Sequence, residues 1–138
     1  TVEDVFPGMI QDELPVYSFL HKGYWIDMGT SETYIQAQMD ALDGKVPLKI
    51  SPSKNPEGPL LVPPVHIGKG CEISQDAQVG PYTVMGDGCR IRSGAVVKNS
   101  ILWAEVTVGG GLTVQNSILG EGVAINKNVN NNSLASET

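Results

Sequence analysis

Between Leu61 and Val129 the hydrophobic positions of the chain recur every six residues. This is neither the two-residue period of an ordinary strand nor the 3.6-residue period of a helix. The leading aliphatic residues are Leu61, Ile67, Ile73, Val79, Met85, Ile91, Val97, Leu102, Val108, Val114, Leu119 and Ile125. The second small or apolar residues, usually four positions later, are Val65, Cys71, Ala77, Thr83, Cys89, Ala95, Ile101, Val106, Leu112, Ile118, Val123 and Val129. A hexapeptide period predicts a parallel β-helix, in which three short strands make one triangular coil.

Two steps of the repeat are one residue short, and both occur in the same sequence context. Val97–Leu102 reads VKNSIL, and Val114–Leu119 reads VQNSIL, 17 residues later. The repeating unit is therefore three hexads, one of which is sometimes shortened. Twelve hexads predict about four coils, a prism about 19 Å long at the strand spacing of about 4.8 Å. The repeat also places Asn99 and Asn116 at equivalent corners, where Asn tolerates the backbone angles that most residues resist.

The residues before the repeat follow a different pattern. Pro15–Leu20 and Tyr24–Met28 each predict a short strand, and we expect them to pair as a hairpin. Residues 31–43 have a broad apolar face and predict a helix that begins after an N-cap at Thr30. The expected order of this part is strand, strand, helix.

Changes in composition divide the chain into four segments. Residues 1–45 carry the strands and helix, and residues 46–60 form a proline-rich linker that we expect to be extended. The β-helix occupies residues 61–129. Residues 130–138 form a polar tail without apolar register, and its Asn run is expected to cover the open end of the last coil.

Charge and cysteine content exclude several classes of function. The chain has 9 Lys and Arg against 15 Asp and Glu, a net charge of -6, which argues against a nucleic-acid binder because such proteins need a basic surface. No apolar run is long enough for a membrane span, and we expect no signal peptide. Cys71 and Cys89 lie one coil apart on an interior ladder, near enough to bridge, but we expect two small buried thiols. Reduced thiols predict a cytoplasmic protein.

The segment Gly23–Thr30 reads GYWIDMGT and resembles the Gly-Tyr-Trp-x-Asp-x-Gly-Thr signature of sugar-1-phosphate nucleotidyltransferases. Asp4–Pro7 resembles the segment that precedes this signature in the family. A proline-rich link followed by a left-handed β-helix resembles the mannose-1-phosphate guanylyltransferase branch. The resemblance implies that the β-helix is left-handed and that residues 1–45 are the end of an α/β catalytic domain. Such enzymes join a nucleoside triphosphate to a sugar 1-phosphate and release pyrophosphate.

The resemblance also implies a metal-binding role for Asp27, as one of two carboxylates that hold Mg²⁺ against the phosphates. A hard cation with oxygen ligands neutralises two polyanions that must meet for in-line displacement at phosphorus. The pattern alone also allows Asp27 to be an ordinary polar residue at a hairpin edge. The family's Gly-rich phosphate loop and first metal-binding aspartate are not found in the chain, and Gly109–Gly111 is a β-helix corner by register. We therefore expect no catalytic or nucleotide-binding residues in this chain alone, and no turnover by it.

Three functions remain open from the sequence. The first is the C-terminal assembly or regulatory part of an NDP-sugar pyrophosphorylase, with GTP and mannose 1-phosphate as the leading substrate pair and GDP-mannose as the product. The second is a hexapeptide-repeat acyltransferase that uses an exposed His66 as general base, while His21 is expected to be a turn residue. The third is a structural module that forms homo-oligomers through the flat faces of its coils. Trp103 and Tyr82 are expected to point outward, where Trp103 would contact the N-terminal part, the linker or another subunit.

Overall fold

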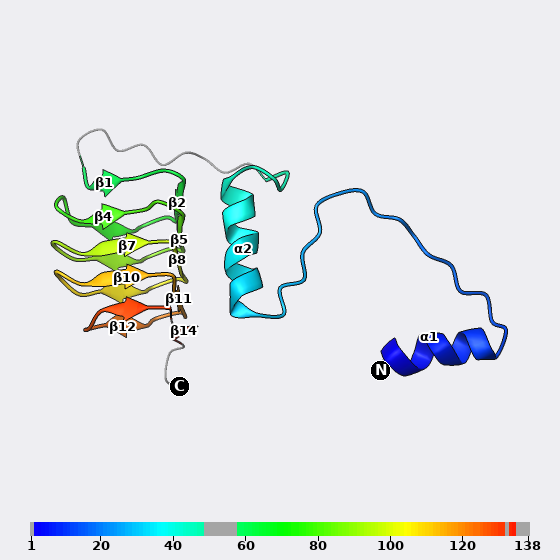
Figure 1. The fold of residues 1–138 in the computed structure, drawn as a ribbon. Helices are drawn as coiled ribbons and strands as arrows, with labels where there is room; N and C mark the ends of the chain where they lie inside the picture. Colours follow the sequence, from blue (N-terminus) through cyan, green and yellow to red (C-terminus); the bar gives the residue numbers. More distant parts are fainter. Residues whose placement is uncertain (1, 49–57, 132, 135–138) are drawn as a thin grey trace.

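The structure is a computed structural model that describes residues 2–48, 58–131 and 133–134. Two helices, α1 (Val2–Gln11) and α2 (Ser31–Leu42), precede a β-helix. Figure 1 shows α1 at the end of a long arm and α2 beside the β-helix. Neither helix of the described residues is long and apolar enough to cross a membrane.

The β-helix consists of short strands that visit three faces in turn. In the described residues these strands are β1 (Leu60–Leu61), β2 (Val65–Ile67), β3 (Glu72–Ile73), β4 (Gln78–Val79), β5 (Thr83–Met85), β6 (Arg90–Ile91), β7 (Val96–Lys98), β8 (Ser100–Leu102), β9 (Thr107–Val108), β10 (Thr113–Gln115), β11 (Ile118–Leu119), β12 (Ala124–Ile125), β13 (Val129–Asn130) and β14 (Ser133–Leu134). Each strand from β4 onward pairs with the strand three positions earlier in the chain, for example β4 with β1. Three consecutive strands therefore make one coil (Figure 1).

All strand pairs are parallel and form three sheets. The first sheet has the order β1-β4-β7-β10-β13, the second β14-β11-β8-β5-β2 and the third β12-β9-β6-β3. Val97 pairs with Val79, 18 residues earlier, and with Val114, 17 residues later. The predicted β-helix of about four coils, with its two shortened sides, is therefore confirmed.

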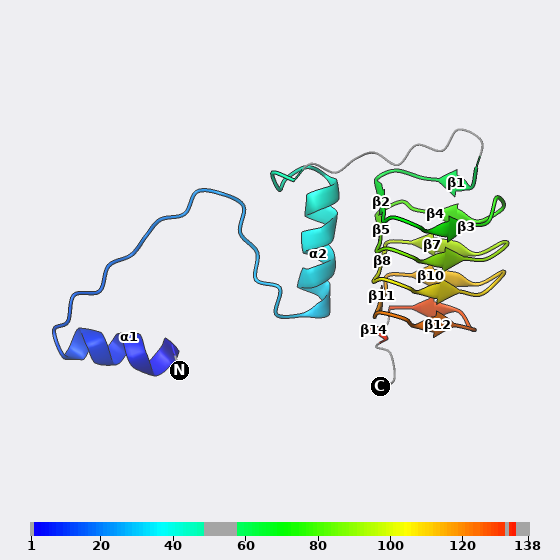
Figure 2. The ribbon, with the colours of Figure 1, turned by 180° about the vertical axis from the view of Figure 1, so that it is seen from behind.

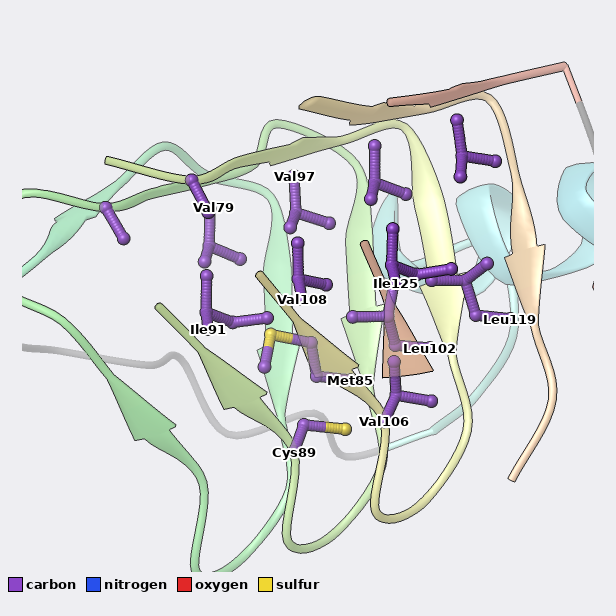
Figure 3. Close-up of a cluster of buried hydrophobic side chains, with 14 of the residues drawn as sticks. Val79, Met85, Cys89, Ile91, Val97, Leu102, Val106, Val108, Leu119 and Ile125 are labelled. Atoms are coloured by element: carbon purple, nitrogen blue, oxygen red, sulfur yellow. The ribbon is translucent and has the colours of Figure 1, made fainter. Parts of the chain in front are cut away.

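The leading residues of the hexads fill the interior of the prism. Figure 3 shows Val79, Met85, Ile91 and Val97 among the side chains packed there, and each of them is at most 1% exposed. This core runs through successive coils without interruption, because stacking places each leading residue on an equivalent one in the next coil. The burial of apolar area along this ladder is the main driving force for folding.

Both cysteines are free, and the expectation of interior thiols is confirmed. Cys89 is fully buried and Cys71 partly so. The Cys71 thiol donates to the carbonyl of Gly86 at 3.2 Å, and the Cys89 thiol to that of Trp103 at 3.0 Å. Burial raises the pKa of Cys89 to about 11, so this thiol is protonated at neutral pH and unreactive.

The assignment of Ile101 and Ile118 to the second positions of their hexads is wrong. Ser100, and not Ile101, pairs with the inward Thr83, and Ile118 pairs with Ile101 on the outward side. The reason is that the shortened step lacks a residue at the corner before its second position. The second position therefore follows the leading residue after three residues and not four. Ser100 and Ser117 therefore point inward, and each hydroxyl donates to a nearby carbonyl, of Lys98 at 2.8 Å and of Gln115 at 2.6 Å.

The segment expected to be a polar tail begins with part of a fifth coil. Val129, expected as a second-position residue, instead pairs with the leading residue Val114. In the backbone register, Leu134 is the partner of Leu119 in the same way. Strand pairing in register therefore continues beyond residue 129, while residues 132 and 135–138 lie outside the described part.

The corner between the first and second sheets is built from residues in the left-handed region. Tyr82, Asn99, Asn116 and Asn131 have φ values of 51°, 49°, 49° and 53°. The Asn99 amide donates to Asn116 Oδ1, and the Asn116 amide to Asn130 Oδ1 at 3.4 Å. The predicted equivalence of the Asn99 and Asn116 corners is thus confirmed. The predicted corner at residues 109–111 is also present, with Gly111 at φ 69°.

The predicted N-terminal hairpin is wrong. Residues 12–30, all of which are described, contain no strand, and α1 forms around Pro7 where no helix was expected. Tyr17 and Phe19 are 90% and 91% exposed, so this part of the arm is not covered by the rest of the described chain. An isolated two-stranded hairpin is marginally stable without further strands or a covering layer.

The predicted helix is confirmed as α2, capped by the Thr30 side chain. Most of the expected linker (residues 49–57) lies outside the described residues.

The Asn corner yields a stability prediction for Asn116. Asn116→Ala places a Cβ-bearing residue without a polar side chain in the left-handed region, whereas Asn116→Gly removes the side chain but keeps the backbone unstrained. We expect the Ala variant to be less stable than the Gly variant by about 1 kcal/mol in urea unfolding followed by circular dichroism. The control is the same pair of changes at Gln75, an exposed turn residue without positive φ, where the Ala variant should be the more stable. Equal stabilities of the two Asn116 variants would contradict this account.

Candidate functional site

The GYWIDMGT segment lies next to α2, and burial alternates along it. Tyr24 and Ile26 are partly buried, whereas Trp25 and Asp27 are exposed. Alternate side chains point to opposite sides of an extended chain. The segment therefore turns Tyr24 and Ile26 toward the rest of the protein and leaves Trp25 and Asp27 on the outer side.

Asp40, in the last turns of α2, is the buried member of a polar cluster that holds this segment. The Tyr24 hydroxyl donates to Asp40 Oδ2 at 2.8 Å. The Gln36 amide and the Lys45 ammonium donate to Asp40 Oδ1 at 2.9 Å and 2.7 Å. Asp40 is 7% exposed, and both of its oxygens accept hydrogen bonds. We call Tyr24, Gln36, Asp40 and Lys45 the Asp40 cluster.

The electrostatics of the Asp40 cluster favour the charged forms of Asp40 and Lys45. Hydrogen bonds from Lys45, Tyr24 and Gln36 lower the pKa of Asp40. The hydrogen bond to Asp40 raises the pKa of Lys45. Burial, followed by the contact with Asp40, raises the pKa of Tyr24. The cluster is therefore an ion pair of Asp40 and Lys45 beside a protonated Tyr24, and both oxygens of Asp40 already accept hydrogen bonds within it.

α2 is in turn attached to the β-helix. It stands beside the second sheet with its axis along the direction in which the coils stack (Figures 1 and 2). The Tyr82 hydroxyl, from an outward corner as predicted, donates to Asp43 Oδ1 at 3.1 Å. Met39 on α2 and Ile101 on the outward side of β8 are 8% and 2% exposed, and both lie outside the core cluster. We attribute the burial of both to the contact between α2 and this sheet.

Asp27 is the one carboxylate of the GYWIDMGT segment, and it is exposed. Its Oδ1 lies 3.4 Å from the position that a Cβ on Gly29 would occupy, so the side chain folds back toward the Gly-Thr turn. The described residues contain no group of three or more His, Cys, Asp or Glu that could hold a metal ion. Mg²⁺ usually takes one or two protein carboxylates together with substrate phosphates. Asp27 fits the role of one such ligand, and its assignment as a metal ligand stays a prediction.

The two histidines lie apart from the Asp40 cluster. His66 is on β2, in register with the outward Val84, as predicted. Its side chain is partly buried, and its buried Nδ1 has no hydrogen-bond partner among the described residues. His66 is therefore less exposed than expected, and its role as a general base stays a prediction. His21 lies over Gly23, where a Cβ would come within 2.5 Å of its Nε2, in keeping with a turn residue. Trp103, 48% exposed, points outward as predicted.

Asp40, Gln36 and Lys45 were not identified from the sequence. One signal was available, because Gln36 and Asp40 are four residues apart on a helix and such positions face each other. Nothing in the pattern showed that Asp40 is buried or that Tyr24 reaches it. That contact depends on the path of the chain between residues 24 and 31.

The β-helix matches a known family. The family model described as GMPPB C-terminal domain matches residues 61–137, more than half of the chain. The chain belongs to this family. It thereby represents the C-terminal β-helix domain found in sugar-1-phosphate nucleotidyltransferases.

Several curated relatives extend the similarity to the N-terminal part. A glucose-1-phosphate adenylyltransferase of Clostridioides difficile (strain 630) is 30% identical over 119 residues, which cover 85% of this chain and 28% of the relative. A probable mannose-1-phosphate guanylyltransferase 2 of Arabidopsis thaliana is 30% identical over 141 residues, covering 89% of this chain and 38% of the relative. A glucose-1-phosphate thymidylyltransferase of Streptomyces antibioticus is 25% identical, with 88% and 38% covered. The chain thus spans about a third of the length of these relatives.

The Asp40 cluster predicts a pH dependence of stability. The folded pKa of Asp40 lies below its usual value of 3.8, so the charged cluster stabilises the fold at pH above about 4. This contribution is lost as the pH falls through the lowered folded pKa. The ¹³C signal of the Asp40 carboxyl should titrate below pH 3.8, and Lys45→Met should move its midpoint upward. Lys22→Met, at an exposed lysine outside the cluster, should leave it unchanged, and an equal effect of both variants would argue against the assignment.

Proposed function

We propose that the chain is the C-terminal assembly or regulatory part of an enzyme that joins a nucleoside triphosphate to a sugar 1-phosphate. The observation that carries this proposal is the direct connection of the GYWIDMGT segment, through α2, to a β-helix of the matched family. The family match and the Arabidopsis relative support GTP and mannose 1-phosphate as substrates and GDP-mannose as product. Relatives named for adenylyl and thymidylyl transfer make ATP and dTTP the competing nucleotides to test.

Asp27 is the residue of this chain that we propose takes part in the chemistry. Its carboxylate is exposed on the side of the segment that Tyr24 does not occupy, so it is free to meet a ligand. Mg²⁺, when bound, would neutralise the phosphates of the two substrates. The contribution of the chain is then to hold one carboxylate oxygen ligand at a fixed place.

The proposed division of labour follows the four segments. Residues 1–45 complete the catalytic domain, residues 46–60 link it, and residues 61–129 assemble the enzyme as a homo-oligomer. The free thiols of Cys71 and Cys89 are consistent with a cytoplasmic enzyme. No contact in the described residues favours acyl transfer.

The role of Asp27 is tested in the complete protein in which the chain occurs. Asp27→Asn should lower kcat/KM for GDP-mannose formation about 100-fold, because several kcal/mol of charge stabilisation depend on the metal. Asp12→Asn changes another exposed aspartate, just after α1, and should leave activity unchanged. Activity of the Asp27→Asn protein within a factor of about two of the control would refute the assignment.

The chain alone should form no nucleotide sugar above background from GTP and mannose 1-phosphate, with or without Mg²⁺. The reason is that its described residues offer one exposed carboxylate in the signature segment and no clustered ligands. Product formation is followed by anion-exchange chromatography, with ATP plus glucose 1-phosphate and dTTP plus glucose 1-phosphate as parallel reactions. Turnover by the isolated chain in any of the three would show that it is more than an assembly or regulatory part.

A further inference from the structure

The Asp40 cluster ties the start of the GYWIDMGT segment to α2 through the Tyr24 side chain. Of the side chains in the described part of this segment, Tyr24 has a hydrogen bond to a residue beyond it, to Asp40 at 2.8 Å. The remaining side-chain hydrogen bonds at its end are within the α2 cap, between Thr30 and Thr33. Asp40 is therefore placed to fix the start of the segment, while the cap fixes its end.

The fixed points flank Asp27. Tyr24 precedes Asp27 by three residues, and Thr30 follows it by three. A segment held at both ends has few conformations left, so its middle carboxylate keeps one orientation relative to α2. Burial alternates between these points, with Ile26 partly covered and Asp27 exposed. If the Tyr24 bond is lost, the segment remains tied at the cap alone and Asp27 gains freedom.

The burial of Asp40 indicates that its contacts have a structural role, in contrast to a chance contact between surface side chains. Among the described residues, Asp40 is the only buried residue with a charged side chain. Three donors provide hydrogen bonds to its two oxygens. The Lys45 side chain is 56% exposed, so its ion pair alone would contribute little, and the arrangement rests on the burial and hydrogen bonds of Asp40. A buried carboxylate with a full set of donors has one favourable arrangement, and its partners are held with it.

We infer that Asp40 is a positioning residue for the Asp27 site: through the Tyr24 hydroxyl it holds the GYWIDMGT segment so that the Asp27 carboxylate meets a divalent cation bound to phosphate. The inference rests on the proposed function, since it requires Asp27 to be a metal ligand. Asp40 itself is not proposed as a ligand, because it is 7% exposed and both of its oxygens accept hydrogen bonds within the cluster. Residues that orient a metal ligand typically change metal affinity by about 10- to 100-fold when they are altered.

The test uses the complete protein and Mn²⁺ as the probe, with free Mn²⁺ measured by electron paramagnetic resonance. Tyr24→Phe removes the hydroxyl that donates to Asp40 and keeps the ring. Its matched control is Tyr17→Phe, which removes the hydroxyl of a tyrosine that is 90% exposed. We expect Tyr24→Phe to raise the Kd for Mn²⁺ about 10-fold and Tyr17→Phe to leave it unchanged. Asp40→Asn, which keeps the size of the side chain, should act in the same direction as Tyr24→Phe.

Asp27→Asn separates failure of this inference from failure of the proposed function. If Asp27→Asn weakens Mn²⁺ binding and Tyr24→Phe does not, Asp40 is a structural residue only and the inference is overturned, while the proposed role of Asp27 stands. If Asp27→Asn binds Mn²⁺ like the unaltered protein, the metal role of Asp27 and the inference both fail. Thermal unfolding is recorded for each variant. A Tyr24→Phe protein that melts like Tyr17→Phe but binds Mn²⁺ more weakly has the signature of a positioning role.

Discussion

Parallel pairing between successive coils is the constraint on which the rest of the structure depends. A strand of two or three residues has no stability of its own, and each one is held by backbone hydrogen bonds to neighbouring coils. Pairing in register forces every coil to place equivalent residues at equivalent points. The leading residues therefore form a continuous core, and the corners repeat their left-handed residues at Tyr82, Asn99, Asn116 and Asn131. The residue missing from the shortened step is lost at such a corner, and the strands on both sides of it keep their pairing.

The proposed site at Asp27 depends on the β-helix indirectly, through α2. The β-helix presents an outward face on which α2 is attached, through Tyr82 and the covered Ile101. α2 in turn carries Asp40, which holds the segment that contains Asp27. Each link is a specific contact between neighbouring elements. A change in the β-helix can therefore reach the proposed metal ligand through two contacts, even though Asp27 itself lies outside the coils.

How far the sequence predicts the structure differs between its parts, for physical reasons. The six-residue period determines the coils because each leading residue, such as Val97, has the same surroundings in every coil. The pattern could not locate the missing residue within the shortened step, since Ile101 and Ser100 are both compatible with a half-buried strand end. The hairpin expected at Tyr17 and Trp25 would need further strands or a covering layer, and local alternation does not reveal whether these are present. The Asp40 cluster depends on tertiary contacts, which produce no periodic pattern in the sequence.

The position of α2 also bears on how the molecule comes apart. In a solenoid each coil interacts with its neighbours only, so terminal coils can fray one at a time. α2 has 12 residues, about 18 Å at about 1.5 Å per residue, close to the height of the stacked coils. The helix lies along one face of the β-helix, beside several coils (Figure 2). Because its contacts at Tyr82 and Ile101 belong to different coils, we expect these coils to unfold more cooperatively than nearest-neighbour coupling alone would give.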